Sequence, residues 1–300
     1  MITPRTAIVT GATSGLGLET ARELARAGTH VILAARNAAR ATAAMADITA
    51  SVPDARLSFE ALDLASLASV RAFAARIGAS VQGLDLLVNN AGVMAIPSRM
   101  VTEDGFEMQL GSNYLGHFAL TMLLMPVLLA APAPRVVSLG SLAAKAGRIN
   151  FDDLQFSRGY SPWTAYSQTK LACVMFALEL ARRAKAQGWA LISAAAHPGW
   201  STTNLQSVGP SMGLGRKSLA EIGMRVFEPL LAQSAAAGAR PTLLAARGAS
   251  IMNGDYTGPN GLGELKGAPT LVRPPVAALN ETNAARLWDM AARLTGTALN

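Results

Sequence analysis

The fold is indicated near the N-terminus by the stretch Thr6-Ala-Ile-Val-Thr-Gly-Ala-Thr-Ser-Gly-Leu-Gly17. Its mostly apolar residues 7–10 predict a buried strand, and residues 16–27 predict a helix that ends at Gly28, a favourable C-cap residue. The glycines between them permit a tight turn and a close approach of backbone to a pyrophosphate at the helix N-terminus. The spacing Gly-x3-Gly-x-Gly differs from the usual dinucleotide fingerprint, so a purely structural turn remains the alternative at this point.

Further apolar runs alternate with helix-like segments along the first two thirds of the chain. Strands are expected at residues 31–34, 57–62, 84–89, 136–139 and 191–196, with a weaker seventh at residues 251–257. Repeated strand–helix–strand units predict a parallel sheet, and continuous apolar strands indicate that helices cover both faces. We therefore expect an α/β fold, a Rossmann-type doubly wound parallel sheet of about seven strands.

The chain is expected to form a single domain over residues 1–300. Residues 201–216 are rich in Gly, Ser and Thr, which predicts a lid-like loop near residues 201–225. A Gly/Pro-rich C-terminal extension is expected near residues 254–300 and is interpreted as an ordered surface loop system.

Composition narrows the possible classes of function. Hydrophobic residues make up 51% of the chain and charged residues 15%, which argues against disorder and for a well-buried globular fold. The formal net charge is +7, but the only adjacent basic pairs are Arg182-Arg183 and Arg216-Lys217. We interpret the charge as a solvated Arg-rich surface that also favours an anionic cofactor, and we infer no nucleic-acid partner.

The single cysteine, Cys173, excludes an intramolecular disulfide and suits a reducing compartment. No signal-peptide pattern precedes the first strand. The apolar residues 115–133 are interrupted by His117, Thr121 and two prolines, which favours a buried core helix over a membrane span. No metal site has ligand-like spacing. These features predict a cytoplasmic protein without a membrane span or a metal ion.

The end of the second predicted strand bears on the choice of dinucleotide. NAD binders carry an acidic residue there for the ribose 2′-hydroxyl. This strand ends Leu33-Ala-Ala-Arg-Asn37 and has no carboxylate. Arg36 is suited to a 2′-phosphate, although an exposed strand-end arginine is the alternative. The sequence therefore favours NADP(H) over NAD(H).

Polar and small residues also follow the third and fourth strands. Asp63, in Leu62-Asp63-Leu64, is interpreted as a cap of the next helix, a partner of the adenine amino group, or both. Asn90-Ala91-Gly92 lets backbone approach the cofactor ribose, with a plain Asn/Gly turn as the alternative.

Helix-like residues 164–184 carry Tyr166 and Lys170, which lie on one helix face. An ammonium group near a phenol stabilises the phenolate, as a general acid/base needs, although such pairs also occur by chance. Ser141 follows the fifth strand at the sheet edge where open α/β folds bind ligands. Its alternative role is a strand-end serine satisfied by backbone. Asn113 enters an apolar helix, where a capping or bending role explains it.

Together these pieces resemble the short-chain dehydrogenase/reductase family over about residues 5–205. The order and spacing that carry the resemblance are Thr10-Gly-x3-Gly15-x-Gly17, Asn89-Asn-Ala-Gly92, Asn113, Ser141, Tyr166-x3-Lys170 and Pro198-Gly199. Residues 138–205 are similar to the retinol-dehydrogenase-related branch. The tail around Tyr256-Thr-Gly-Pro-Asn-Gly resembles bacterial members of that branch.

The resemblance implies roles for these residues. Tyr166 would protonate the carbonyl oxygen in reduction or deprotonate the alcohol in oxidation, and Lys170 would assist it and bind the nicotinamide ribose. Ser141 would orient the substrate oxygen, and Asn113 would hold a water in a proton relay. Thr203 would lie near the nicotinamide amide or the pyrophosphate. The cofactor-binding residues expected are Gly11, Thr13, Ser14, Gly15, Leu16, Gly17, Arg36, Asp63, Leu64, Asn90, Ala91, Gly92, Tyr166, Lys170, Pro198, Gly199 and Thr203.

The chain also departs from the family pattern. Gly140 stands where a second serine is usual, and Ser201 stands where an aliphatic residue is usual. The retinol branch often has a membrane anchor, and none is expected here. His197 is interpreted as a structural histidine.

Loops after the fourth, fifth and sixth strands are expected to line a substrate pocket. They supply mostly apolar and aromatic side chains: Val93, Met94, Leu142, Tyr160, Trp163, Trp200, Leu205 and Met212. A lipophilic ketone, aldehyde or secondary alcohol is the predicted substrate, unless these side chains only pack a lid.

Two other classes of function stay open. One is a catalytically silent NADP(H)-binding sensor or regulator, for which intact Ser141, Tyr166 and Lys170 have no use. The other is a scaffold protein with an apolar interaction face. The composition permits this role, but a scaffold role does not predict the motifs. A homodimer or homotetramer is possible by analogy with related enzymes.

Overall fold

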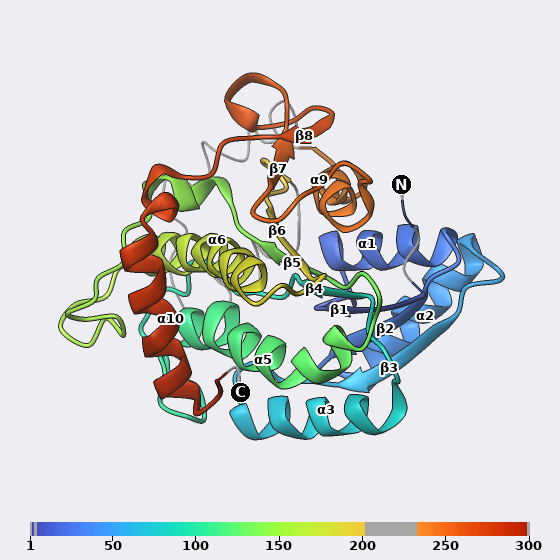
Figure 1. Cartoon of the computed structure of the whole chain (residues 1–300), viewed down its shortest axis with the longest axis horizontal. Coiled ribbons are helices and arrows are strands. Elements are labelled where there is room, and N and C mark those ends of the chain that lie inside the picture. The colour runs from blue at the N-terminus through green and yellow to red at the C-terminus, as the bar shows by residue number, and fades with distance from the viewer. Residues whose placement is uncertain (1, 3–4, 202–232, 299–300) are drawn as a thin grey trace.

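The structure is a computed structural model that describes residue 2, residues 5–201 and residues 233–298. Within them eight strands form one sheet in the order β3-β2-β1-β4-β5-β6-β7-β8 (Figure 1). Every strand pair is parallel except β7 with β8. The strands are β1 (Thr6–Thr10), β2 (His30–Ala35), β3 (Leu57–Ala61), β4 (Leu86–Asn89), β5 (Arg135–Leu139), β6 (Ile192–Ala196), β7 (Tyr256–Pro259) and β8 (Pro269–Leu271). The predicted α/β class with a mostly parallel sheet is confirmed.

The last part of the sheet differs from the prediction of about seven strands. The seventh strand begins at Tyr256, not at residue 251, because the Met252 amide donates to the Asp255 carboxylate at 2.8 Å and closes a turn there. The eighth strand has only three residues, begins at a proline and runs antiparallel along the sheet edge. A short proline-bearing edge strand lacks the apolar run that marks buried strands, so the sequence gives little sign of it.

Helices cover both faces of the sheet (Figure 1). On one face lie α1 (Gly15–Arg26), α2 (Ala38–Ser51) and α9 (Ala235–Arg247). On the other face lie α3 (Leu67–Ser80), α5 (Gly116–Leu129) and α6 (Pro162–Ala186), and α10 (Glu281–Thr295) packs outside α5 and α6. Apolar strand residues contribute alternately to the two cores. Ile8 faces the core under α3, α5 and α6, and Val9 faces the core under α1, α2 and α9.

The predicted core helix around residues 115–133 continues from α4 (Met108–Leu110) through the π-helical turn η1 (Gly111–Leu115) into α5. Among the described residues, this one helix, Met108–Leu129, is long and apolar enough by length and composition to cross a membrane. In the fold, 72% of the most apolar stretch of this helix is buried. Phe118 of α5 contacts Phe176 of α6 and Trp288 of α10, with ring centroids 5.7 and 5.0 Å apart. The helix therefore packs as a core helix does.

The C-terminal extension is more regular than a loop system. It contains β7, β8, the short helices η3 (Leu262–Glu264) and η4 (Val276–Leu279), and α10. Trp288 of α10 stacks on Phe176 with ring centroids 5.5 Å apart, and the Arg183 guanidinium lies 4.5 Å from the Trp288 ring. The predicted lid-like loop, apart from Ser201, lies outside the described residues.

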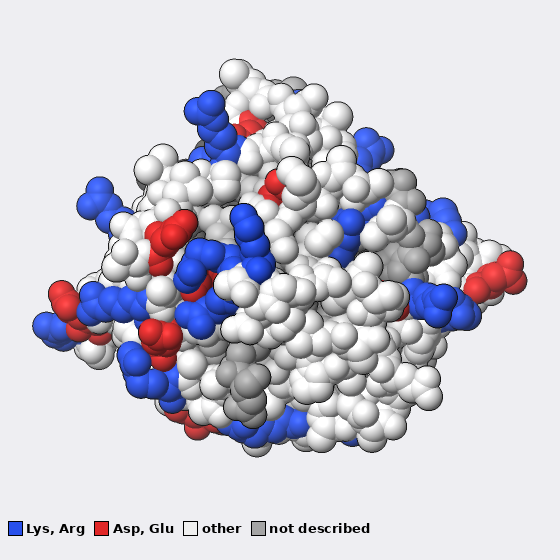
Figure 2. Space-filling model, in the orientation of Figure 1, with Lys and Arg blue, Asp and Glu red and all other residues white. Residues whose placement is uncertain are grey.

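Figure 2 shows the charges on one face of the molecule. Basic side chains stand in small groups with acidic ones among them, not in one continuous stripe. Among the described residues, Arg22 pairs with Asp47 and Arg76 pairs with Glu60. This distribution is that of a solvated charged surface.

Candidate active site

The glycine turn between β1 and α1 has the backbone that the sequence predicts. Gly11 and Gly15 have φ angles of 66° and 55°, in the left-handed region that favours glycine. A Cβ at Gly17 would collide with the Gly11 carbonyl and with the Asn90 side chain. The turn therefore requires glycine for both its conformation and its packing.

The N-terminus of α1 differs from those of α2, α3 and α9. The N-cap residues of those three helices accept hydrogen bonds from first-turn amides, through Asn37, Ser66 and Ser234. Ser14 makes no such bond at α1, and the first turn of α1 has no acidic residue. Its amides are left for an anion, which is the arrangement that binds a pyrophosphate. These residues fit a dinucleotide.

Thr10, the last residue of β1, joins this turn to the end of β4. Its hydroxyl oxygen accepts hydrogen bonds from the Asn90 and Ala91 amides, both at 2.9 Å. The Asn90 side chain returns a bond to the Thr10 carbonyl at 2.7 Å. The predicted residues at the ends of β1 and β4 therefore form one unit. Sequence reasoning did not assign Thr10, although a hydroxyl beside the first glycine is a usable signal.

Arg36 and Asp63 lie after β2 and β3. Arg36 is exposed and makes no hydrogen bond or ion pair within the part of the chain that the structure describes. Asp63 accepts from the Ala65 amide at 2.9 Å, whereas Ser66 caps α3, so a cap role for Asp63 is wrong. Leu64 packs partly buried against the core under α5. The guanidinium of Arg36 is thus free to meet a phosphate.

Helix α6 positions Tyr166 and Lys170 one turn apart, each only 4% exposed. The Lys170 ammonium donates to the Leu139 carbonyl at 3.1 Å and lies 5.9 Å from the centroid of the Tyr166 ring. Ser141, two residues beyond Leu139, begins the short helix η2 (Leu142–Ala146) and accepts from the Ala143 amide at 3.2 Å. That bond uses an oxygen lone pair, so the Ser141 hydroxyl hydrogen stays available to a ligand.

Asn113 lies in the π-helical turn η1 and is 1% exposed. Its side chain accepts from the Val93 amide at 2.7 Å and donates to the Val93 carbonyl at 2.9 Å. A Cβ at Gly92 would lie 3.1 Å from the Asn113 side chain and 3.6 Å from the Lys170 ammonium nitrogen. Gly92, Asn113 and Lys170 therefore meet at one place, and π-turns of this kind often occur at functional sites.

The Pro198-Gly199 segment follows β6 and is connected through His197 to the C-terminal extension. Gly199 has φ 65°, and its amide donates to Nδ1 of buried His197 at 3.2 Å. His197 Nε2 lies 2.9 Å from a Glu264 carboxylate oxygen, and Lys145 pairs with the other oxygen at 2.8 Å. Burial lowers the pKa of His197 to about 4, although Glu264 opposes the shift. Sequence reasoning missed this cluster because its members lie far apart in the chain.

The remaining sequence observations concern Thr203, Gly140 and a possible metal site. Thr203 lies outside the described residues. A Cβ at Gly140 would lie 2.8 Å from the Val174 side chain and 3.2 Å from the Tyr256 hydroxyl, which explains a glycine there. Among the described residues, no group of three or more His, Cys, Asp and Glu side chains is arranged to hold a metal ion.

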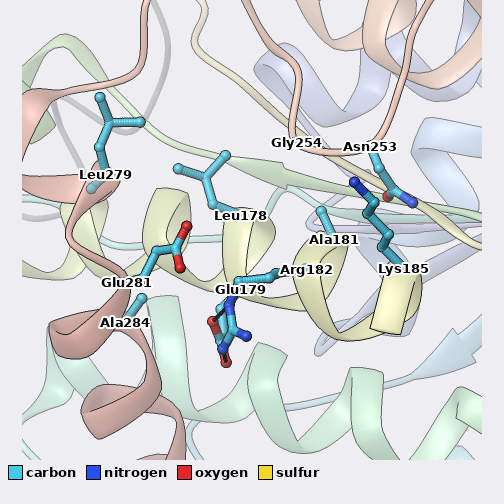
Figure 3. Close-up of a pocket in the computed structure, with 11 residues that line it drawn as sticks. Leu178, Glu179, Ala181, Arg182, Lys185, Asn253, Gly254, Leu279, Glu281 and Ala284 are labelled. Atoms are coloured by element: carbon cyan, nitrogen blue, oxygen red, sulfur yellow. Dashed lines mark hydrogen bonds and ion pairs between the residues drawn. The ribbon is translucent and has the colours of Figure 1, made fainter. Parts of the chain in front are cut away.

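A separate pocket of about 260 Å³ lies at the far end of α6 (Figure 3). Its lining includes Glu179, Arg182, Lys185 and Asn253, none of which is a predicted site residue. Figure 3 shows Arg182 beside Glu179, and the two pair at 2.6 Å. From Tyr166 to Lys185 the helix rises by about 28 Å, so this pocket is distinct from the candidate active site.

Comparisons with known proteins agree with the fold and with these motifs. Residues 5–212 match the family described as short chain dehydrogenase. Human retinol dehydrogenase 13 is 42% identical over 295 residues, which cover 97% of this chain and 85% of that protein. Mouse polyprenol dehydrogenase is 49% identical over 205 residues, covering 67% and 61% of the two chains. A crystal structure of a protein from Mycobacterium paratuberculosis, 41% identical, superposes with a TM-score of 0.80 over 99% of this chain and 95% of that one.

Proposed function

We propose that this chain, which belongs to the short-chain dehydrogenase family, transfers a hydride between NADP(H) and a carbonyl/alcohol pair. One observation carries the proposal above the others. The Lys170 ammonium donates to the carbonyl of Leu139, the last residue of β5, at 3.1 Å. Tyr166 precedes Lys170 by one helical turn, and Ser141 follows Leu139 by two residues. A phenol, a cation and a hydroxyl near the carboxyl edge of the sheet, where open α/β folds bind ligands, support the proposal.

The cofactor part of the proposal rests on the glycine turn and on Arg36. The uncapped first turn of α1 suits the pyrophosphate, and Gly92 keeps space beside Lys170. Arg36 is free to pair with a 2′-phosphate, which supports NADP(H) over NAD(H). When bound, the nicotinamide supplies or accepts the hydride.

The chain's own residues handle the proton and the substrate oxygen. In reduction, the Tyr166 hydroxyl gives its proton to the carbonyl oxygen, and in oxidation the Tyr166 phenolate takes the proton from the alcohol. The Lys170 ammonium stabilises the phenolate by its charge. The Ser141 hydroxyl donates a hydrogen bond to the same substrate oxygen and steadies its developing negative charge.

A lipophilic substrate is supported by the apolar side chains near Tyr166. Trp163 is 54% exposed, and its ring centroid lies 6.0 Å from that of Tyr166. The Tyr160 hydroxyl donates to the Ile96 carbonyl at 2.8 Å, so its polar group already has a partner within the protein. Leu205 and Met212 lie outside the described residues. The relatives named as retinol and polyprenol dehydrogenases act on apolar alcohols, which agrees with this choice.

The experiment is NADPH oxidation, followed by absorbance, with a panel of bulky apolar aldehydes and ketones beside small charged keto acids. We expect turnover of the apolar carbonyls and a lower KM for NADPH than for NADH. Turnover of the charged substrates alone would contradict the substrate class. NADPH binding without turnover in either direction would instead support a catalytically silent sensor. A cytoplasmic location and a homo-oligomer stay predictions.

A further inference from the structure

His117 lies between the cofactor turn and the candidate catalytic helix. It follows Asn113 by one turn at the start of α5 and is 4% exposed. Its Nε2 lies 2.9 Å from the Thr10 hydroxyl oxygen, and its Nδ1 lies 2.9 Å from the Asn113 carbonyl oxygen. The family resemblance assigned this residue no role.

The partners determine where the imidazole proton lies. The Asn113 carbonyl can only accept, so Nδ1 carries the hydrogen and donates it. In a neutral ring Nε2 then holds a lone pair and accepts from the Thr10 hydroxyl, which lies closer to Nε2, at 2.9 Å, than to its other acceptor, the Val88 carbonyl, at 3.3 Å. The two lone pairs of that hydroxyl are used by the Asn90 and Ala91 amides, both at 2.9 Å. Every hydrogen and lone pair in this chain of bonds has a partner.

The ring stays neutral over the ordinary working range of pH. Burial is the main cause that lowers the pKa of His117 to about 4, and the Lys170 charge lowers it further. The hydrogen bond to Asn113 opposes that shift. A protonated ring would place a hydrogen on Nε2 against a hydroxyl whose lone pairs are already used.

We infer that His117 is a positioning residue that fixes the cofactor turn of β1 and β4 relative to the π-turn carrying Asn113. The inference rests on the proposed function. Through Thr10, His117 acts on Asn90 and Ala91, and through Asn113 it acts on the place where Gly92 and Lys170 meet. Loss of the His117 side chain should therefore weaken cofactor binding and shift Asn113 and its neighbours beside Lys170.

A leucine would satisfy packing alone at this position. α5 is otherwise apolar, and its buried residues include Phe118, Leu120 and Leu124. A histidine there costs desolvation unless both ring nitrogens are bonded. Both are bonded here, Nε2 to Thr10, which lies 107 residues away, and Nδ1 to the Asn113 carbonyl one turn earlier. The hydrogen bonds to Thr10 and Asn113 therefore explain why a polar residue stands at position 117.

The first experiment reads the proton position directly. The sequence has three histidines, so ¹⁵N-labelled histidine gives three resolvable side chains in NMR spectra of the whole protein. For His117 we expect the tautomer protonated on Nδ1, without titration down to about pH 5. The Nε2-protonated tautomer, or titration near the ordinary histidine pKa, would overturn the inference.

The second experiment compares two variants to separate the loss of the His117 hydrogen bonds from a change in side-chain volume. His117→Leu keeps an apolar filling but loses both bonds, whereas His117→Gln keeps an amide that can donate and accept. For His117→Leu we expect NADPH binding, read by nucleotide fluorescence, to weaken by about tenfold or more. For His117→Gln we expect it to stay within about threefold of wild type. His30→Leu is the matched control, because His30 bonds Ser58 away from the site, and its NADPH affinity should not change.

Thermal unfolding of every variant is measured alongside. If His117→Leu fails to fold, Thr10→Val interrupts the same chain of bonds and is expected to weaken NADPH binding similarly. Wild-type affinity in a folded His117→Leu or Thr10→Val protein would overturn the inference alone. Equal losses in the Leu and Gln variants would also overturn it. A wild type that binds no NADPH would overturn the proposed function, and the tautomer measurement would still read the hydrogen bonds independently.

Discussion

Two regions of the molecule organise the carboxyl edge of the sheet in different ways. From β1 to α6, the contacts are made at or beside strand ends, such as Thr10 with Asn90 and Lys170 with Leu139. From β6 to α10, the Pro198-Gly199 segment depends on His197, which contacts Glu264 across 67 residues. Each region buries one histidine, and their tautomers are opposite. His117 carries its hydrogen on Nδ1, and His197 carries it on Nε2, because the Gly199 amide occupies Nδ1.

The difference separates what each region does. The first region would present backbone amides and small residues to a cofactor that is chemically constant, so a short pattern is enough to build it. In the second region, side-chain pairs between distant segments hold the Pro198-Gly199 segment. The proposed chemistry belongs to the first region, and the predictions below test the two regions.

The largest expected effect is on the first region. Lys170→Ala removes the cation fixed to the Leu139 carbonyl, and kcat/KM should fall by about 10²- to 10⁴-fold. Steady-state NADPH oxidation measures it. Lys185→Ala, at the far end of the same helix, is the control and should leave kcat/KM unchanged. Equal activity of the two variants would remove Lys170 from the chemistry.

The next prediction tests how much the second region contributes to the stability of the fold. Trp288 is 3% exposed, stacks on Phe176 and contacts the Arg183 guanidinium. Trp288→Ala should lower the free energy of unfolding by about 3–5 kcal/mol, measured by denaturant titration. Trp163→Ala, which truncates an exposed ring, should change it by less than about 1 kcal/mol. A small effect at Trp288 would mean that α10 is not part of the core.

The sequence was most informative where chemistry and local structure coincide. The positive φ of Gly11 and Gly15, and the pairing of Tyr166 with Lys170 on one helix face, follow from local rules. The two cores on the sheet faces follow from apolar strands and amphipathic helices.

The sequence was least informative where a contact joins distant segments. Nothing near Glu264 indicates that it meets His197 and Lys145, and the three-residue strand β8 has no apolar run. His117 looked like an interruption of an apolar helix, because its partner Thr10 lies 107 residues away. Such pairs depend on the folded topology and not on local spacing.

Acid should weaken both regions through their buried histidines. The pKa of His117 and of His197 lies near 4 in the fold, below the ordinary 6.5, so the unfolded chain binds protons first. Stability is therefore complete above pH 6.5 and falls as pH drops toward 4, by about 3 kcal/mol for His117 and in the same direction for His197. Denaturant titrations at several pH values measure it. The variants His117→Gln and His197→Gln should each reduce this pH dependence, and an unchanged dependence would contradict the burial argument.

A smaller effect tests which dinucleotide the first region prefers. Arg36→Asp removes a charge-assisted bond to a 2′-phosphate and adds a repulsion. The ratio of kcat/KM for NADPH over NADH should fall by about 10- to 100-fold. Arg26→Asp makes the same change of net charge at an exposed arginine at the other end of α1 and is the control. An unchanged ratio would remove Arg36 from cofactor selection.

The most direct test of the account compares wild type with Tyr166→Phe in two assays on the same preparations. One assay measures NADPH binding by fluorescence, and the other measures NADPH oxidation with a bulky apolar carbonyl that the wild type turns over. The account predicts equal binding and a loss of turnover of about 10²- to 10⁴-fold in the variant, because only the phenol hydroxyl supplies the proton. Undiminished turnover in Tyr166→Phe would contradict the assignment of Tyr166 as the acid/base and, with it, the proposed mechanism.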